Sequence, residues 1–150
     1  MRARQFLVCA MLLNWAWCPA ARAELGGGIG TSQVAPSPAN AQRRVLSAEN
    51  YTVHEYQLAS GTQVREYLSS SGSVFAVAWN GPFMPNLQEL LGSYFGQYRQ
   101  ALETARGGLG PVMIQRPGLV VHSEGHMRAF SGKAYLPEFL PKNLSAEEIR

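Results

Sequence analysis

The most constraining feature of the sequence is a predicted strand, Ser73–Trp79, that is apolar on both faces. One face carries Val74, Ala76 and Ala78, and the other carries Phe75, Val77 and Trp79. A strand of this kind is stable only where both of its faces are covered. We therefore predict that it lies in the interior of a sheet, with a layer of structure on each side.

Segments with a period of two residues flank this strand. Tyr51–Leu58 and Thr62–Leu68 alternate polar and apolar residues before it, and glycine-containing turns separate the three segments. Gly118–His122, His126–Phe130 and Lys133–Tyr135 follow in the last third of the chain. Short alternating segments separated by turns indicate antiparallel strands.

Between the two sets of strands lies one long predicted helix, Asn86–Arg106. Its apolar residues follow the i, i+3, i+4, i+7 spacing of an amphipathic helix. Asn86 with Glu89 resembles a capping box, and Gly92 and Gly96 share a face that would allow close approach to the sheet or to a partner. The predicted fold is α+β: an antiparallel sheet of five to six strands in β-β-β-α-β-β order, packed by one long helix.

The N-terminal residues have the three parts of an export signal. Arg2 and Arg4 precede the apolar run Phe6–Trp17, and Ala21-Arg22-Ala23 has the small-x-small pattern of a cleavage site. The apolar run of about 12 residues is shorter than the ~20 residues that cross a bilayer. We expect residues 1–23 to be a signal peptide, and the rest to act in the periplasm or outside the cell without a membrane span.

The chain after the signal divides by composition. Residues 24–49 are rich in glycine and proline and lack apolar periodicity, so we expect a flexible linker, with Leu25 and Ile29 as anchors should it order. Residues 50–141 contain the predicted strands and helix and form the α+β globular domain. Residues 142–150 are expected to be a frayed C-terminal tail.

Loss of the signal changes the charge and the redox chemistry. The full sequence has 13 basic and 10 acidic residues, and removal of Arg2, Arg4 and Arg22 leaves ten of each. A net charge near zero argues against nucleic-acid binding, which needs a surplus of basic residues. Both cysteines, Cys9 and Cys18, lie in the signal. The exported domain therefore has no disulfide and depends on its hydrophobic core.

Three segments resemble the bacterial family DUF2844, whose function is unassigned. They are Tyr51–Glu55, Val77–Pro82 and Gly125–Gly132. The resemblance runs from Tyr51 to Pro137 and implies an exported bacterial protein of one small domain. It implies no catalytic residue, because the family has no assigned activity.

One group of residues has the composition of a metal site. His122 and His126 flank a predicted turn, Ser123–Gly125, that contains Glu124. If that turn closes a hairpin, the two imidazoles become cross-strand neighbours about 5 Å apart at Cβ. Two histidines and a carboxylate suit zinc or copper. The alternative interpretation is that all three are polar residues on an exposed hairpin.

Other chemistry-bearing residues are few. Trp79 and Arg128 are candidate ligand-binding residues, because an aromatic face supplies contact area and a guanidinium suits an anion. Glu55 and Glu66, on neighbouring predicted strands, are the carboxylate pair that a glycosidase would use. No G-x-S-x-G motif and no phosphate-binding loop occur in the sequence.

These observations favour a non-enzymatic exported module that binds an envelope protein or a small ligand, with no catalytic residue and no cofactor. The alternative is a small metal-binding protein or hydrolase that uses His122, Glu124 and His126 with zinc or copper.

Overall fold

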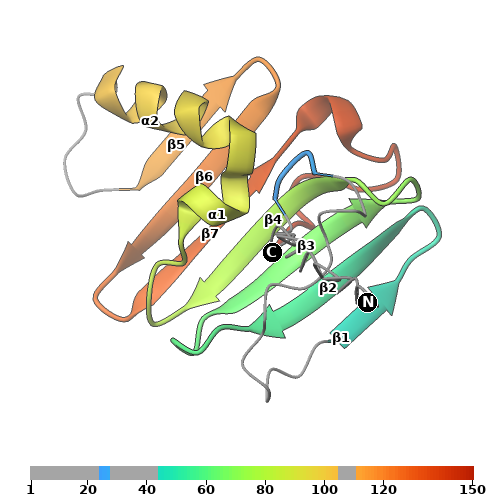
Figure 1. Ribbon diagram of the computed structural model, residues 1–150, viewed down its shortest axis with the longest axis horizontal. Coiled ribbons are helices and arrows are strands. Elements are labelled where there is room, and N and C mark those ends of the chain that lie inside the picture. The colour runs from blue at the N-terminus through green and yellow to red at the C-terminus, as the bar shows by residue number, and fades with distance from the viewer. Residues whose placement is uncertain (1–23, 28–43, 105–110) are drawn as a thin grey trace, which may run out of the picture.

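The computed structural model describes residues 24–27, 44–104 and 111–150 (Figure 1). Its main element is a seven-stranded antiparallel sheet with the strand order β1-β2-β3-β4-β7-β6-β5. The strands are β1 (Arg44–Ser47), β2 (Tyr51–Gln57), β3 (Gln63–Ser69), β4 (Val74–Gly81), β5 (Val112–Arg116), β6 (Leu119–His126) and β7 (Ala129–Tyr135). The predicted signal peptide lies outside the described residues.

The predicted fold class is confirmed in outline, but the strand count and order differ. Four strands precede the helical region and three follow it, where three and two or three were predicted. The additional strands are β1, a four-residue edge strand, and β5, in which Ile114 alone is buried. Both are too short, and too exposed, to show a pattern of alternation. No helix among the described residues has the length and apolar character needed to cross a membrane.

The predicted turn at Ser123–Gly125 is wrong. β6 continues through these residues to His126, whose Cα partner is Ala129, so the chain reverses at Met127-Arg128. Gly125 serves a close approach within the hairpin instead, because a Cβ at this position would lie 2.5 Å from the carbonyl oxygen of Ala129. The residues that looked like a turn are therefore paired residues of a longer strand.

The helix forms where the sequence predicts it, but it is interrupted. α1 (Leu87–Leu91) and α2 (Phe95–Thr104) are joined by the 3-10 helix η1 (Gly92–Tyr94). The Asn86 side chain caps α1 by accepting a hydrogen bond from the Gln88 N–H at 3.1 Å. Such a cap satisfies one of the backbone donors that every helix leaves unpaired at its start.

The two glycines of the helical region have different surroundings. Gly92 ends α1 with a φ of 51°, and a Cβ at this position would overlap the side chain of Glu24. A Cβ at Gly96 would meet no atom within 4 Å outside its own helix, among the residues that the structure describes. The predicted close contact with the sheet is therefore wrong. Gly92 lies against Glu24, and the space around the Gly96 Cα on its outer side is unoccupied by the residues that the structure describes.

One face of the sheet, here called the helix face, is covered by α1, α2 and the segment around Leu25 (Figure 1). Leu25 is fully buried, and its N–H donates to the Leu90 carbonyl at 3.0 Å. The predicted flexible linker over residues 24–49 is therefore wrong at both ends, at Leu25 and at β1. Leu25 is the anchor that its apolar side chain suggested, and Ile29 lies outside the described residues.

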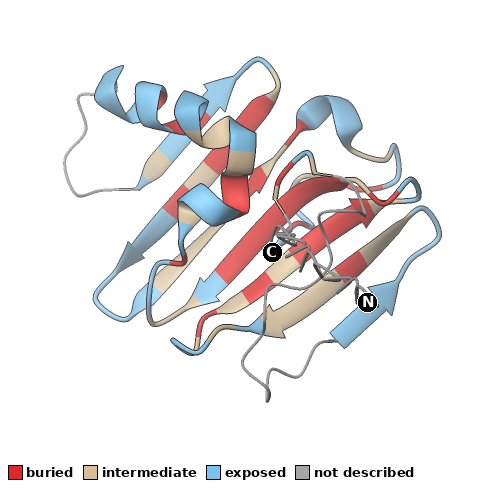
Figure 2. Ribbon diagram, viewed as in Figure 1, coloured by how far each residue is buried: buried red, intermediate tan, exposed pale blue. Residues whose placement is uncertain are grey.

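The opposite face, here called the tail face, is covered over its centre by residues 137–150, here called the C-terminal segment. This segment begins with the 3-10 helix η2 (Pro137–Phe139). Leu144 and Ile149 are buried in a cluster with Tyr67, Phe75 and other residues of β2, β3 and β4. The predicted frayed tail over residues 142–150 is wrong because these two side chains complete the core. Both faces of β4 are thus covered, as predicted, and its buried residues form part of the band in Figure 2.

The strand register places residues of similar chemistry in rows that cross the tail face. The first row is apolar and consists of Leu46, Val53, Tyr67, Ala76, Tyr135 and Val120. The second row carries most of the charge and consists of Arg44, Glu55, Arg65, Ala78, Lys133, His122 and Met113. The third row is polar and consists of Gln57, Gln63, Asn80, Ser131 and Glu124. The C-terminal segment packs on the first row and on Ala78 of the second row. The charged residues of the second row and the polar residues of the third row shape a site beside it.

Candidate functional site

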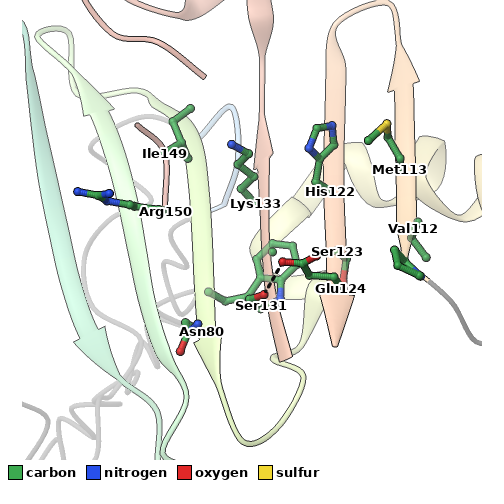
Figure 3. Close-up of a pocket in the computed structure, with 13 residues that line it drawn as sticks. Asn80, Val112, Met113, His122, Ser123, Glu124, Ser131, Lys133, Ile149 and Arg150 are labelled. Atoms are coloured by element: carbon green, nitrogen blue, oxygen red, sulfur yellow. Dashed lines mark hydrogen bonds between the residues drawn. The ribbon is translucent and has the colours of Figure 1, made fainter. Parts of the chain in front are cut away.

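A pocket of about 330 Å³ lies where β4, β7, β6 and β5 meet the end of the C-terminal segment (Figure 3). Its lining from the tail side is Asn80, Met113, His122, Glu124, Ser131, Lys133, Ile149 and Arg150. Four further strand residues line the pocket and, by strand alternation, belong to the helix face: Trp79, Val112, Ser123 and Gly132. The last lining residue, Pro111, precedes β5. The pocket has the size of the smaller sites that bind low-molecular-mass ligands, which begin at about 300 Å³.

The polar side chains of the pocket come from neighbouring strands. Ser131 on β7 donates a hydrogen bond to Oε1 of Glu124 on β6, at 3.3 Å (Figure 3). His122 and Lys133 are directly opposite each other in the same strand pair. The Lys133 ammonium donates to the carbonyl oxygen of Ala146, in the C-terminal segment, at 2.5 Å. The pocket therefore holds a carboxylate–hydroxyl pair beside a histidine–lysine pair.

Two ring nitrogens of the lining are buried and lack a hydrogen-bond partner among the described residues. They are Nε1 of Trp79, a residue that is 3% exposed, and Nε2 of His122. A buried polar group left unpaired costs about 1–3 kcal/mol. The indole of Trp79 lies directly against the main chain of Gly132, because a Cβ at Gly132 would overlap Cζ2 of the ring. Trp79 belongs to the helix face and His122 to the tail face, so the two unpaired nitrogens lie on opposite sides of the sheet.

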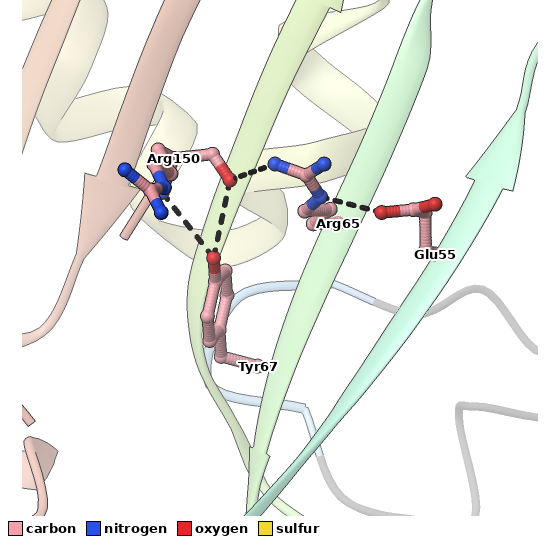
Figure 4. Close-up of polar contacts among 4 residues, drawn as sticks. All are labelled: Glu55, Arg65, Tyr67 and Arg150. Atoms are coloured by element: carbon pink, nitrogen blue, oxygen red, sulfur yellow. Dashed lines mark hydrogen bonds and ion pairs between the residues drawn. The ribbon is translucent and has the colours of Figure 1, made fainter. Parts of the chain in front are cut away.

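The wall of the pocket made by Ile149 and Arg150 is anchored to the sheet (Figure 4). The Arg150 N–H donates to the Tyr67 hydroxyl at 3.2 Å, and that hydroxyl donates to the main-chain oxygen of Arg150, also at 3.2 Å. Arg65 donates to the same main-chain oxygen, and its Nε is 2.6 Å from Oε2 of Glu55. The charged second row therefore fixes the edge of the pocket.

The three residues predicted to bind a metal lie in one line. His122, Glu124 and His126 alternate along β6 and point to the same face, so the two histidines are about 13 Å apart at Cα. Their predicted cross-strand pairing is wrong, because His122 is paired with Met113 and Lys133. Within the part of the chain that the structure describes, no three histidine, cysteine or acidic side chains are grouped closely enough to hold a metal. Binding of zinc or copper stays a prediction.

The structure separates the other candidate residues. Trp79 lines the pocket, whereas Arg128 lies at the exposed tip of the β6–β7 hairpin with a φ of 66° and does not line it. Glu55 is paired with Arg65, and Glu66 with His54, so the two glutamates lie on opposite faces of the sheet. Glu66 is buried on the helix face, where it accepts a hydrogen bond from the Tyr56 hydroxyl at 2.8 Å. The two glutamates therefore do not form a carboxylate pair.

Sequence reasoning missed Lys133, Ser131, Asn80 and Arg150. Each is an ordinary polar residue in its own segment, and the first three become neighbours only through the pairing of β4, β7 and β6. The sole signal in the sequence is that Asn80, Ser131 and Lys133 occupy polar positions of strands, and Arg150 has no such signal.

The fold and the pocket define a class of protein: a small α+β domain with one sheet face packed by a helix and a ligand-sized pocket shaped largely by the other. A family model described as "Protein of unknown function (DUF2844)" matches residues 21–149, which is nearly the whole chain. The chain belongs to this family, as the resemblance of its three segments implied. Comparison with curated proteins and with solved structures gave no match.

Proposed function

We propose that this protein is a non-enzymatic binding module of the bacterial cell envelope, exported to the periplasm or beyond, and that the pocket is its ligand site. The observation that carries the proposal is the buried, unpartnered Nε2 of His122, a residue that lines a pocket of about 330 Å³. Groups of this kind are stabilised when a ligand supplies the missing hydrogen bonds.

The composition of the lining supports a small ligand. Sites for small molecules are mostly apolar, with a few polar groups that fix orientation. Here Val112, Met113 and Ile149 supply apolar surface, and Ser131 and Lys133 supply hydrogen-bonding groups. These polar groups come from strands of one sheet, so they are held rigidly before a ligand arrives.

A titration followed by NMR tests the proposal. The exported protein, labelled with ¹⁵N, is mixed with the low-molecular-mass fraction of an envelope extract, and the indole N–H signal of Trp79 is followed, assigned with a Trp79→Phe variant. We expect this signal to shift. A Ser131→Phe variant, which fills the pocket, should lose the response.

A matched control is Ser71→Phe, at an exposed position in the turn between β3 and β4. This variant should respond like the parent protein. A signal that no fraction moves, or a response that survives in Ser131→Phe, contradicts the proposed site. N-terminal sequencing of protein from the periplasmic fraction tests export separately. The expected first residue is Glu24, and recovery of Met1 contradicts cleavage.

A further inference from the structure

We infer that the ligand of this pocket is a small organic monoanion with an apolar body and one carboxylate group, an inference that rests on the proposed function. The charge of the polar lining, the position of the unpartnered His122 nitrogen and the apolar remainder of the lining all point to this class of molecule.

The charged residues of the lining favour an anion. Lys133 and Arg150 are the lysine and arginine side chains of the described lining, and Glu124 is its single acidic side chain. Glu124 already accepts the Ser131 hydroxyl. Lys133 uses one of the three donors of its ammonium on the Ala146 carbonyl, which leaves donors for a ligand. An excess of positive charge in a concave site concentrates anions there, so Lys133 is the group that binds the carboxylate.

His122 provides the second donor for the carboxylate. It is the cross-strand neighbour of Lys133, and the two side chains lie next to each other in Figure 3. Its Nε2 is buried without a partner among the described residues, and it carries a proton in one tautomer of the neutral ring. One oxygen of a carboxylate then binds the Lys133 ammonium and the other binds His122 Nε2–H. One carboxylate satisfies this pair of donors.

The remainder of the lining requires an apolar body. Val112 and Ile149 contribute aliphatic surface, and Met113 is 69% exposed although it is a large apolar side chain. Exposed apolar surface next to a pocket is typical of a site that a ligand covers. An inorganic anion would leave this surface in water, so the observations favour an amphiphilic molecule.

Three probes test the ligand class: phenylbutyrate, its neutral isostere phenylbutyramide, and acetate, which has the charge without the apolar body. Each is titrated into the exported protein while the Trp79 indole N–H signal is followed. Because a hydrogen bond to a charged group contributes more than a neutral one, phenylbutyrate should bind about tenfold more tightly than phenylbutyramide. It should also bind about tenfold more tightly than acetate, because acetate has no apolar body to cover the apolar lining.

Lysine variants give the matched controls. Lys133→Gln should reduce the affinity for phenylbutyrate to that for the amide, and Lys133→Arg, which keeps the charge, should retain the preference. Lys142 is the other lysine of the chain and is exposed, so Lys142→Gln should leave the preference unchanged. Equal binding of acid and amide, a preference that survives in Lys133→Gln, or no binding of any probe overturns the ligand class. The proposed function is decided separately by the titration with envelope extract.

Discussion

Gly132 is a residue of the site at which a side chain has no room. Its absent side chain lets the indole of Trp79 lie against β7, and a Cβ there would also lie 2.6 Å from the carbonyl oxygen of His122. We expect Gly132→Ala to lower the free energy of unfolding by about 1–3 kcal/mol, because both neighbours are held by the sheet and cannot move away without strain. Urea denaturation followed by circular dichroism measures the change.

Gly96→Ala is the matched control at this scale. The position is helical and open, so the added methyl group meets no neighbour and the helix gains up to about 1 kcal/mol. Opposite signs for the two glycine-to-alanine changes are expected. A Gly132→Ala protein that unfolds at the urea concentration of the parent would show that Trp79 does not pack on this main chain.

At the scale of elements, the C-terminal segment depends on a small number of polar anchors. The Tyr67 hydroxyl makes two hydrogen bonds with the main chain of Arg150. Tyr67→Phe should therefore lower the free energy of unfolding by about 1–2 kcal/mol. It should also raise the hydrogen–deuterium exchange of residues 144–150, as measured by mass spectrometry.

Tyr51→Phe is the comparison for this change, since the Tyr51 ring lies in the same aromatic cluster, 6.3 Å from the ring of Tyr67. This variant should leave exchange of the C-terminal segment unchanged. If the two variants increase that exchange equally, the anchor is the aromatic packing and not the hydroxyl group.

The elements that the sequence predicted are those with a repeating pattern. β2 and β3 alternate over seven residues, and β4 is apolar on both faces from Val74 to Trp79. The helical region keeps its apolar spacing across the break at Gly92. The hairpin turn was missed because Met127-Arg128 contains none of the residues that favour tight turns. The C-terminal segment was missed because its order depends on two separate apolar residues, Leu144 and Ile149, that have no period.

At the scale of the whole molecule, stability should be greatest in β4. Both of its edges are hydrogen-bonded, to β3 and β7, and both of its faces are covered. Amide protons of Phe75–Trp79 should exchange only through global unfolding, and those of β1, an exposed edge strand, through local opening. Native-state hydrogen exchange by NMR measures both, and equal protection of the two strands would contradict this account of the core.

The candidate site was predictable only in part, because it is assembled by the strand pairing of the whole sheet. Trp79, His122 and Glu124 were identified from the sequence as candidate binding residues, the first for its aromatic face and the other two as metal ligands, and all three line the pocket. Lys133, His122 and Glu124 form one site with Asn80 and Arg150 because of strand pairings that span the sheet. Register between distant strands is a property of the assembled molecule, so local pattern could not supply it.

On the tail face, the polarity of the side chains changes more along the strands than across them. Along a strand, side chains on this face follow one another at about 7 Å and change from apolar to charged to polar, whereas across the strands their character is largely preserved. The C-terminal segment covers the centre of the apolar row, so a ligand meets the charged and the polar rows. Along the strands, the tail face therefore changes from apolar surface that the C-terminal segment covers to polar surface that is left for a ligand.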